Sequence, residues 1–467
     1  MIGTPTIPNY ENATNGNSAT VTDEAPQSTP KTRHLSAPTT VEETGLPEEL
    51  LVQLLVRTLF THGELTERSA GEIMKLPYGV MKELFTLIQR EKFCEVKGHG
   101  ESLGVLLRYV LTEAGRERAK AFLDLCRYVG PAPVTLQQYV AMVKSQPVNS
   151  LTIDRRTVTA ATEHLVLTPG TVDQLGEAVN SGWAIFLYGP PGNGKTVLAE
   201  AIGKMLEAVG GGEVYIPYAM EVDGQIIQIY DPITHVKVDT PQEASRSLIE
   251  NKKESDTRWV LCKRPIEFAG GELTMATLDL SFNASAKYYK APPHIKSNGG
   301  VFLIDDFGRQ LVRPRDLLNR WIVPLEKRVD YLTLHTGKVF QLPFDTIVLF
   351  ATNLEPAKLA DEAFLRRIRN KIYIADPTPE RFKQIFEEVC KKKGVPYDPD
   401  SVDYLLTGVY EKYSLNMRSC HPRDILEQII SIAKFNSVPA TLSKKFIDRA
   451  CHTYFFVEAA EYDQTSS

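Results

Sequence analysis

The sequence predicts an α/β protein built on a parallel sheet, and three stretches of the chain support this fold class. Residues 184–188, 301–304 and 347–351 are short apolar runs of the kind found in strands buried on both faces. Each run ends in glycine or in polar residues. The segments between them alternate between strand-like and helical patterns, which indicates parallel strands joined by crossover helices.

The first run leads into a glycine-rich turn, which is followed by a helical pattern over residues 197–202. The turn and the residue after it are Gly189, Pro190, Pro191, Gly192, Asn193, Gly194, Lys195, Thr196 and Val197. Strand, glycine-rich turn and helix form the context of a phosphate-binding loop, whose glycines let the backbone wrap closely around an anion. Lys195 adds a positive charge for the β- and γ-phosphates, and the Thr196 hydroxyl is placed to bind Mg²⁺. A tight turn that matches by chance is the alternative, and the complete match in this context disfavours it.

The second and third runs each present polar side chains at the end of a predicted strand, where ligands of parallel sheets lie. Asp305 is expected to hold Mg²⁺, directly or through water, and Asp306 to orient and polarise an attacking water. Asn353 is expected to donate to the γ-phosphate or to position that water. Acids or Asn after a strand are common in turns, so each signal is weak alone. Together with the phosphate loop they predict a site for ATP and Mg²⁺.

With these motifs in place, residues 150–450 resemble the AAA+ ATPase superfamily. The phosphate loop matches its Walker A motif, residues 301–306 match Walker B, and Asn353 matches sensor 1. The resemblance implies an arginine finger within residues 361–368, where Arg367 matches best and Arg366 precedes it. Such an arginine would reach the γ-phosphate of a neighbouring subunit in a homo-oligomeric ring, most often a hexamer. A basic surface helix end is the alternative for this segment.

The same resemblance implies a sensor 2 arginine, Arg423, which would reach back to the phosphates from a helical lid. One departure concerns Asp306, because the superfamily usually has glutamate there. Aspartate is one methylene shorter, which puts fast turnover in doubt but not nucleotide binding.

Two further stretches resemble one branch of the superfamily. Residues 331–342 read as a hairpin with a glycine in its turn, as in the MoxR-like ATPases and the bacterial enhancer-binding activators. Tyr288, Tyr289 and Lys290 are candidates for a pore loop that grips a polypeptide. The alternative is that one or both tyrosines pack under the segment that precedes the Walker B strand.

Composition and patterning divide the chain into six parts. Residues 1–45 are rich in Thr, Pro, Asn and Ser and are expected to be a disordered tail. The following parts are a winged-helix-like domain over 46–128, a linker over 129–164, the nucleotide-binding α/β domain over 165–372, a helical lid over 373–456 and a frayed tail over 457–467.

The winged-helix-like domain is predicted from three helical patterns, two strand-like runs around a glycine-rich turn, and a final helix. Its third helix would enter a DNA major groove, with outward candidates at Tyr78, Lys82, Gln89 and Arg90. Glu83 and Glu91 dilute these bases, and acids and bases are about equal in number across the domain. We therefore favour protein docking over DNA binding for this domain.

Overall composition limits the remaining possibilities. The 467 residues carry a formal net charge of −5, which argues against wholesale coating of nucleic acid. The six cysteines form no C-x-x-C pair, which favours a reduced, cytoplasmic setting over a zinc site or a disulfide framework. No apolar run reaches the roughly 18–20 residues of a membrane span, and the N-terminus lacks the apolar centre of a signal peptide.

The leading hypothesis from the sequence is an ATP-hydrolysing AAA+ ring that remodels a protein partner in a chaperone-like manner. The N-terminal domain would recruit that partner. A nucleotide-switched DNA-binding regulator is the main alternative. A nearly inactive ATP-binding assembly factor is a third, because of Asp306.

Overall fold

The computed structural model describes residues 35–99, 107–209, 211–238, 255–359 and 362–455. The tail expected over residues 457–467 lies outside this part, as does the N-terminal tail up to residue 34. Residues 35–45, which the sequence assigns to that tail, are different. They include the short helix η1 (Glu42–Thr44), and Val41 and Thr44 are buried.

The central sheet has five parallel strands in the order β10-β13-β16-β5-β17. The strands are β5 (Ile185–Tyr188), β10 (Ile266–Ala269), β13 (Val301–Ile304), β16 (Ile347–Thr352) and β17 (Asn370–Tyr373). The three predicted apolar runs are therefore three adjacent strands in the middle of one sheet. This confirms the α/β class with a parallel-sheet core.

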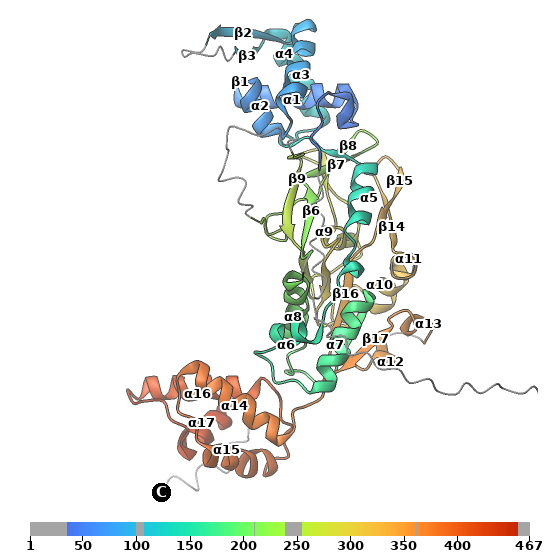
Figure 1. Ribbon diagram of the computed structural model, residues 1–467. Helices are drawn as coiled ribbons and strands as arrows, with labels where there is room; N and C mark the ends of the chain where they lie inside the picture. The colour runs from blue at the N-terminus through green and yellow to red at the C-terminus, as the bar shows by residue number, and fades with distance from the viewer. Residues whose placement is uncertain (1–34, 100–106, 210, 239–254, 360–361, 456–467) are drawn as a thin grey trace, which may run out of the picture. The chain divides into compact units, whose positions relative to one another are not determined.

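Alternate residues along these strands pack on opposite faces of the sheet. Ile185 and Leu187 face a layer that contains α6 (Arg155–Ala161), α7 (Pro169–Ser181) and α8 (Lys195–Ala208) (Figure 1). Phe186 faces the other layer, which contains the two helices α10 (Pro314–Arg320) and α11 (Ile322–Lys327).

Aromatic packing fills the second layer. The rings of Phe186 and Phe350 stack with centroids 5.7 Å apart, and Trp321 meets Phe302 edge-on at 5.6 Å. Such pairs add stabilisation beyond the apolar area that they bury. Both faces of the sheet are thus covered, which explains why its strands are uninterrupted apolar runs.

A second, five-stranded sheet has the order β11-β12-β8-β7-β4. Its strands are β4 (Val134–Thr135), β7 (Ala219–Val222), β8 (Gln225–Gln228), β11 (Ser281–Asn283) and β12 (Tyr288–Lys290). Two antiparallel pairs accompany it: β6 (Glu213–Pro217) with β9 (Trp259–Lys263), and β14 (Val329–Thr333) with β15 (Val339–Pro343). The β14–β15 pair is the hairpin predicted over 331–342, and Gly337 adopts a positive φ of 87° in its turn.

The N-terminal region contains α1 (Glu48–His62), α2 (Glu67–Met74), α3 (Tyr78–Arg90) and α4 (Glu113–Leu125). An antiparallel sheet of order β1-β3-β2 accompanies them: β1 (Glu64–Thr66), β2 (Cys94–His99) and β3 (Leu107–Leu111). The helices and the two longer strands agree with the sequence, whereas β1 was not predicted. The glycine-rich turn expected between β2 and β3 lies outside the described residues. That this region functions as a winged-helix domain remains a prediction.

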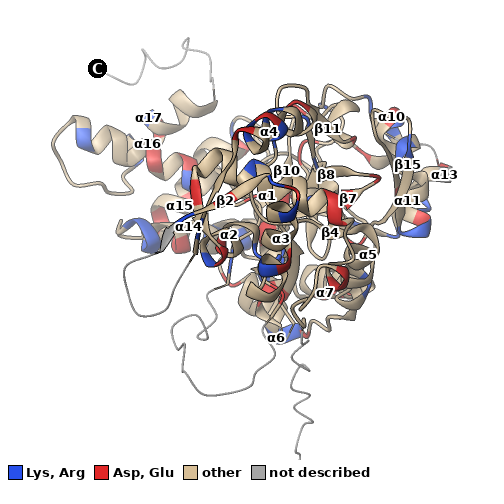
Figure 2. Cartoon of the chain, turned by 90° about the horizontal axis from the view of Figure 1, so that it is seen from above, with Lys and Arg blue, Asp and Glu red and all other residues tan. Residues whose placement is uncertain are grey.

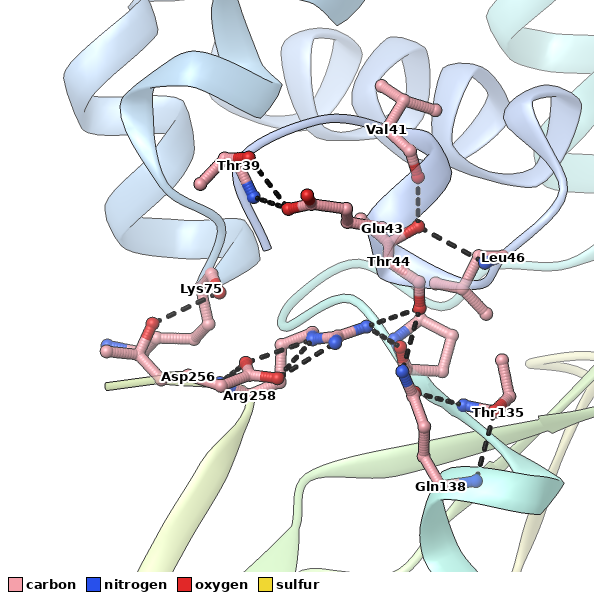
Figure 3. A network of polar contacts seen from close by, with 12 residues as sticks. Thr39, Val41, Glu43, Thr44, Leu46, Lys75, Thr135, Gln138, Asp256 and Arg258 are labelled. Atoms are coloured by element: carbon pink, nitrogen blue, oxygen red, sulfur yellow. Dashed lines mark hydrogen bonds and ion pairs between the residues drawn. The ribbon is translucent and has the colours of Figure 1, made fainter. Parts of the chain in front are cut away.

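A buried polar junction joins this region to the second sheet and its neighbours (Figure 3). Arg258 is 1% exposed and pairs with Asp256, which is 6% exposed, through bonds of 2.8 to 3.2 Å. The same guanidinium donates to the carbonyl oxygens of Thr44 and Pro133, at 3.3 and 3.2 Å. Gln138 donates to the Thr44 carbonyl as well. Residues near 44, 133–138 and 256–258 are therefore held together.

Residues 129–164 are more structured than the predicted linker. They contain β4, α5 (Leu136–Ser145), the short helix η2 (Val148–Ser150) and α6. A capping box between Thr135 and Gln138 begins α5. The linker prediction overlooked the apolar residues of this stretch, of which Val134, Tyr139 and Val143 are buried against the second sheet and its neighbours.

The C-terminal region is helical, as predicted. Its elements are α14 (Pro379–Lys393), α15 (Pro399–Leu405), the π-helical turn η5 (Leu406–Glu411), α16 (His421–Phe435) and α17 (Lys444–Phe455). They bury an apolar core of their own, centred on Phe382, Phe386 and Ile425. Among the helices described here, none is both long enough and apolar enough to cross a membrane.

Candidate nucleotide-binding site

The predicted phosphate loop connects β5 to α8 at the carboxyl end of the central sheet. Its backbone requires glycine at the first position, because a Cβ on Gly189 would lie 2.3 Å from the carbonyl oxygen of Ile374. Gly192 and Gly194 adopt positive φ angles of 77° and 79°, which side chains other than glycine rarely tolerate. Gly194 then occupies the N-cap position of α8. The loop therefore leaves its own N–H groups and the start of a helix available to an anion.

Lys195 is buried in this loop, where it is 8% exposed. Its ammonium donates to the carbonyl oxygens of Gly189 and Pro190, at 3.0 and 2.8 Å. Burial lowers the pKa of Lys195, and the nearby carboxylates of Asp305 and Asp306 act in the opposite direction. A cation that has lost much of its hydration gains from a further anionic partner, so Lys195 is suited to attract a polyphosphate.

The next two strands along the sheet from β5, β16 and β13, bring the other predicted residues to the same edge. Thr196 donates from Oγ1 to Oδ2 of Asp305 over 2.8 Å, although 109 positions separate them in sequence. Asn353 donates from Nδ2 to Oδ1 of Asp306 over 3.1 Å. Thr196, Asp305, Asp306 and Asn353 therefore form two hydrogen-bonded pairs beside Lys195.

Asp305 and Asp306 differ in their surroundings. Asp305 is half-buried, and its Oδ1 accepts a bond from the backbone N–H of Asp306. Asp306 is exposed and adopts a positive φ of 50°, which turns the chain sharply after β13. A hydroxyl and a carboxylate in contact are a donor set that Mg²⁺ accepts, because this ion is usually held by one or two protein oxygens together with substrate phosphates. The residues present therefore fit a magnesium ion.

A cavity of about 430 Å³ opens beside the phosphate loop. Its size is in the range of small-molecule pockets. Several separate segments line it: residues 164–168, 192–194, Val197, residues 373–375, and Arg381, Ser419, Cys420 and Arg423 of the C-terminal helical region. The helical region thus closes one side of the cavity, and Arg381 also donates to the carbonyl oxygen of Val166.

The two arginines before α16 and in its first turn lie in different places. Arg423, the predicted sensor 2 residue, lines the cavity, pairs with its neighbour Asp424 at 2.9 Å and has a side chain 59% exposed. Arg418 pairs instead with Asp376, which also accepts a bond of 2.7 Å from Asn193 of the phosphate loop. The sequence reading missed Arg418 and Asp376, because neither falls in a motif.

The predicted arginine finger residues also differ from each other. Arg367 is 18% exposed and donates to Glu326, on α11 of the same chain. Arg366 is exposed. Arg367 is thus bonded to α11 of its own chain. The catalytic candidates Asp306 and Asn353 are bonded to each other beside the phosphate loop.

The pore-loop candidates lie on β12. Tyr289 is 1% exposed, accepts a bond from the backbone N–H of His335 over 2.9 Å and contacts the His335 ring. Tyr288 is half-buried against Tyr128, with ring centroids 5.4 Å apart. Lys290 is exposed. The pore-loop prediction is therefore wrong for Tyr289, which packs inside the fold and cannot grip a polypeptide.

Three comparisons with known proteins give partial matches. A family model described as a domain of unknown function, DUF8689, matches residues 378–453, which are the C-terminal helices. The vesicular-fusion protein sec18 of Schizosaccharomyces pombe is 35% identical over 86 residues, or 17% of this chain and 11% of sec18. The chain thus spans about a tenth of the length of that relative.

Among solved structures, a point mutant of RuvB from Thermotoga maritima aligns at a TM-score of 0.34 and 12% identity, over 66% of this chain and 72% of that one. The T. maritima RuvB Holliday junction branch migration motor aligns at 0.34 and 12%, over 62% and 70%. Scores of this size do not establish a shared function.

Proposed function

We propose that this chain is an AAA+-type ATPase that binds ATP with Mg²⁺ and uses its hydrolysis to remodel a protein partner. The observation that carries the proposal is the hydrogen bond between Thr196 and Asp305. It brings the last residue of a phosphate loop and the carboxylate that follows β13 to one point, which is the arrangement that a nucleotide-bound Mg²⁺ requires.

The roles of the site residues follow from their positions. Residues 189–197 bind the phosphates through their N–H groups and Lys195, and Thr196 and Asp305 hold Mg²⁺, which would neutralise developing charge when bound. Asp306 and Asn353, joined by their 3.1 Å bond, hold and polarise the attacking water. The 430 Å³ cavity beside Gly192–Gly194 accepts the nucleoside.

Ring assembly, most often as a hexamer, completes the proposal. Arg367 is engaged with Glu326 on α11 of its own chain, and the AAA+ resemblance assigns its segment to the site of a neighbour. A neighbouring subunit therefore supplies Arg367 or Arg366. The N-terminal region recruits the protein partner. Acidic and basic side chains are interspersed over α3 and α4 rather than gathered into a basic stripe, which supports a protein partner over DNA (Figure 2).

The test is the replacement Lys195→Ala, with Lys204→Ala as the matched control. Lys204 is an exposed lysine on the same helix, so its loss changes the net charge equally and leaves the loop intact. We expect Lys195→Ala to lose Mg·ATP binding in calorimetry while Lys204→Ala binds as the wild type does. Equal affinity in all three proteins, with circular dichroism showing them folded, would remove the phosphate-loop assignment.

A further inference from the structure

The outer end of the phosphate loop is bonded to the segment that precedes α16. The Gly192 carbonyl accepts a bond of 2.8 Å from the backbone N–H of Cys420. The Asn193 side chain is engaged at both ends: its oxygen accepts from the Ser419 N–H at 3.0 Å, and its Nδ2 donates to Asp376 at 2.7 Å. The position of the helical region is thus tied directly to the loop.

Asp376 is shared between the loop and that segment. The same oxygen, Oδ1, accepts the bond from Asn193 and the bond from the Arg418 guanidinium. The Asp376 side chain is 35% exposed and that of Arg418 is 19% exposed, so solvent screens their ion pair only in part. An anion with more charge than one carboxylate could compete for this arginine.

Arg418 lies beside the phosphate loop. A Cβ on Gly192 would lie 3.5 Å from the Cβ of Arg418, and the Arg418 guanidinium shares Asp376 with Asn193. Asn193 precedes Lys195 by two positions, so Arg418 is close to the part of the loop that would hold the phosphates. Arg423, by contrast, is engaged with Asp424 and lines the cavity beside the loop.

We propose that Arg418 is the residue that distinguishes ATP from ADP. Asp376 holds the Arg418 guanidinium when no terminal phosphate is bound, and it competes with that phosphate when ATP is bound. This inference rests on the proposed function. Asp376 binds both Arg418 and Asn193, and these bonds hold the helical region on the loop. A terminal phosphate draws Arg418 away from Asp376 and leaves the Asn193 contact in place. ADP lacks that phosphate and leaves the ion pair intact, so the two nucleotides differ in whether Asp376 or the terminal phosphate holds Arg418.

The test compares the dissociation constants of a slowly hydrolysed ATP analogue and of ADP, by calorimetry with Mg²⁺, across single variants. Arg418→Ala should weaken the analogue by about ten- to a hundredfold, the range of one charge-assisted bond, and leave ADP nearly unchanged. Arg418→Lys, which keeps the charge but not the fork, should fall between. Asp376→Asn should tighten the analogue relative to ADP, because the competing charge is gone while an oxygen remains for Asn193. Arg423→Ala, the matched control, should change both nucleotides alike.

A merely structural ion pair would give a different pattern. Arg418→Ala would then weaken the binding of both nucleotides equally, and Asp376→Asn would not favour binding of the analogue. Either result overturns the inference. If Arg418→Ala does not fold, the ratio measured for Arg418→Lys and Asp376→Asn decides alone. Failure of the proposed function is distinguishable, since the wild-type chain would then bind neither nucleotide.

Discussion

Arg367 donates from Nε to Oε1 of Glu326 over 2.9 Å, within one chain. Glu326 lies near the end of α11, and Arg367 follows the short helix α13 (Glu362–Leu365). To act on a neighbouring subunit, Arg367 must either break its bond with Glu326 or use that bond to orient its guanidinium. Arg366, next to it, is exposed. The trans-acting role is therefore best tested on both residues.

We expect Arg367→Ala to bind ATP normally and to lose roughly 10³-fold or more in hydrolysis, the range of arginines supplied in trans. Mixing it with Lys195→Ala should restore part of the activity, because an intact loop then meets an intact arginine in mixed rings. Steady-state hydrolysis measured against protein concentration and mixing ratio checks this.

Two comparison variants make the arginine test sharper. Glu326→Gln should hydrolyse within a few-fold of the wild type, because it removes the carboxylate charge beside Arg367 and keeps the arginine. If Arg366→Ala abolishes hydrolysis and Arg367→Ala does not, the role belongs to Arg366. If mixed rings form by sizing and no mixture regains activity, neither arginine acts in trans.

Asp306→Asn should still bind Mg·ATP but hydrolyse it on the order of 10²-fold more slowly or worse, because an amide cannot polarise the attacking water. Single-turnover measurements with saturating nucleotide separate this effect from binding. Asp305→Asn should instead weaken the dependence of binding on Mg²⁺. Asp316→Asn, on the exposed side of α10, serves as the control. Normal turnover in Asp306→Asn would assign the catalytic acid to another residue.

Removing one partner of the Arg258–Asp256 pair should destabilise the protein strongly. Arg258→Met leaves a carboxylate that is 6% exposed without its cation, which typically costs about 3–5 kcal/mol. The thermal unfolding midpoint should drop clearly, and Arg258→Met combined with Asp256→Leu should recover much of the loss. Arg68→Met removes an exposed pair with Glu72 and should change the midpoint little. Equal midpoints for Arg258→Met and Arg68→Met would contradict the prediction.

His421 should make the folded protein less stable as the pH falls. Burial, aided by Arg418, lowers the pKa of His421 from 6.5 to about 4, and its Nδ1 lies 2.8 Å from the Tyr410 hydroxyl. Between these values the unfolded chain takes up a proton that the folded chain does not, so stability falls from about pH 6.5 down to about pH 4. This group adds no further loss below that.

Thermal midpoints of the wild type and of His421→Gln, measured through this pH range, isolate the contribution of His421. The difference between the two proteins should shrink or change sign as the pH falls, because the variant has no imidazole to protonate. His62→Gln, at an exposed position on α1, should run parallel to the wild type. A constant difference between wild type and His421→Gln across the range would show that His421 titrates alike in both states.

Much of the site could be predicted because its residues directly follow predicted strands in the sequence. The phosphate loop, Asp305 and Asn353 each follow an apolar run, and the parallel order of β13, β16 and β5 brings these ends together. Arg418 and Asp376 could not be found in this way. Their pairing depends on how the helical region packs on the loop, and nothing in the sequence near either residue records that packing.

The same reason explains why the prediction for Tyr289 was wrong and why the buried Arg258–Asp256 pair was not predicted. Tyr289 was predicted to line a pore because of the AAA+ resemblance and its aromatic ring, and only the sheet shows that this side chain is buried. Arg258, two residues from Asp256, looks like an ordinary surface pair. Its burial arises from carbonyl groups 125 and 214 residues away.

The Arg258 junction also determines where the chain can be divided for protein engineering. A chimera that exchanges only residues 46–128 leaves every junction residue in the host, so the junction itself is unchanged. A graft that begins before Thr44 and ends after Gln138 carries both carbonyl groups and the α5 capping box with it, and needs Asp256 and Arg258 in the recipient. Exchange of this longer segment between relatives of this chain should therefore succeed only where the recipient supplies these two residues.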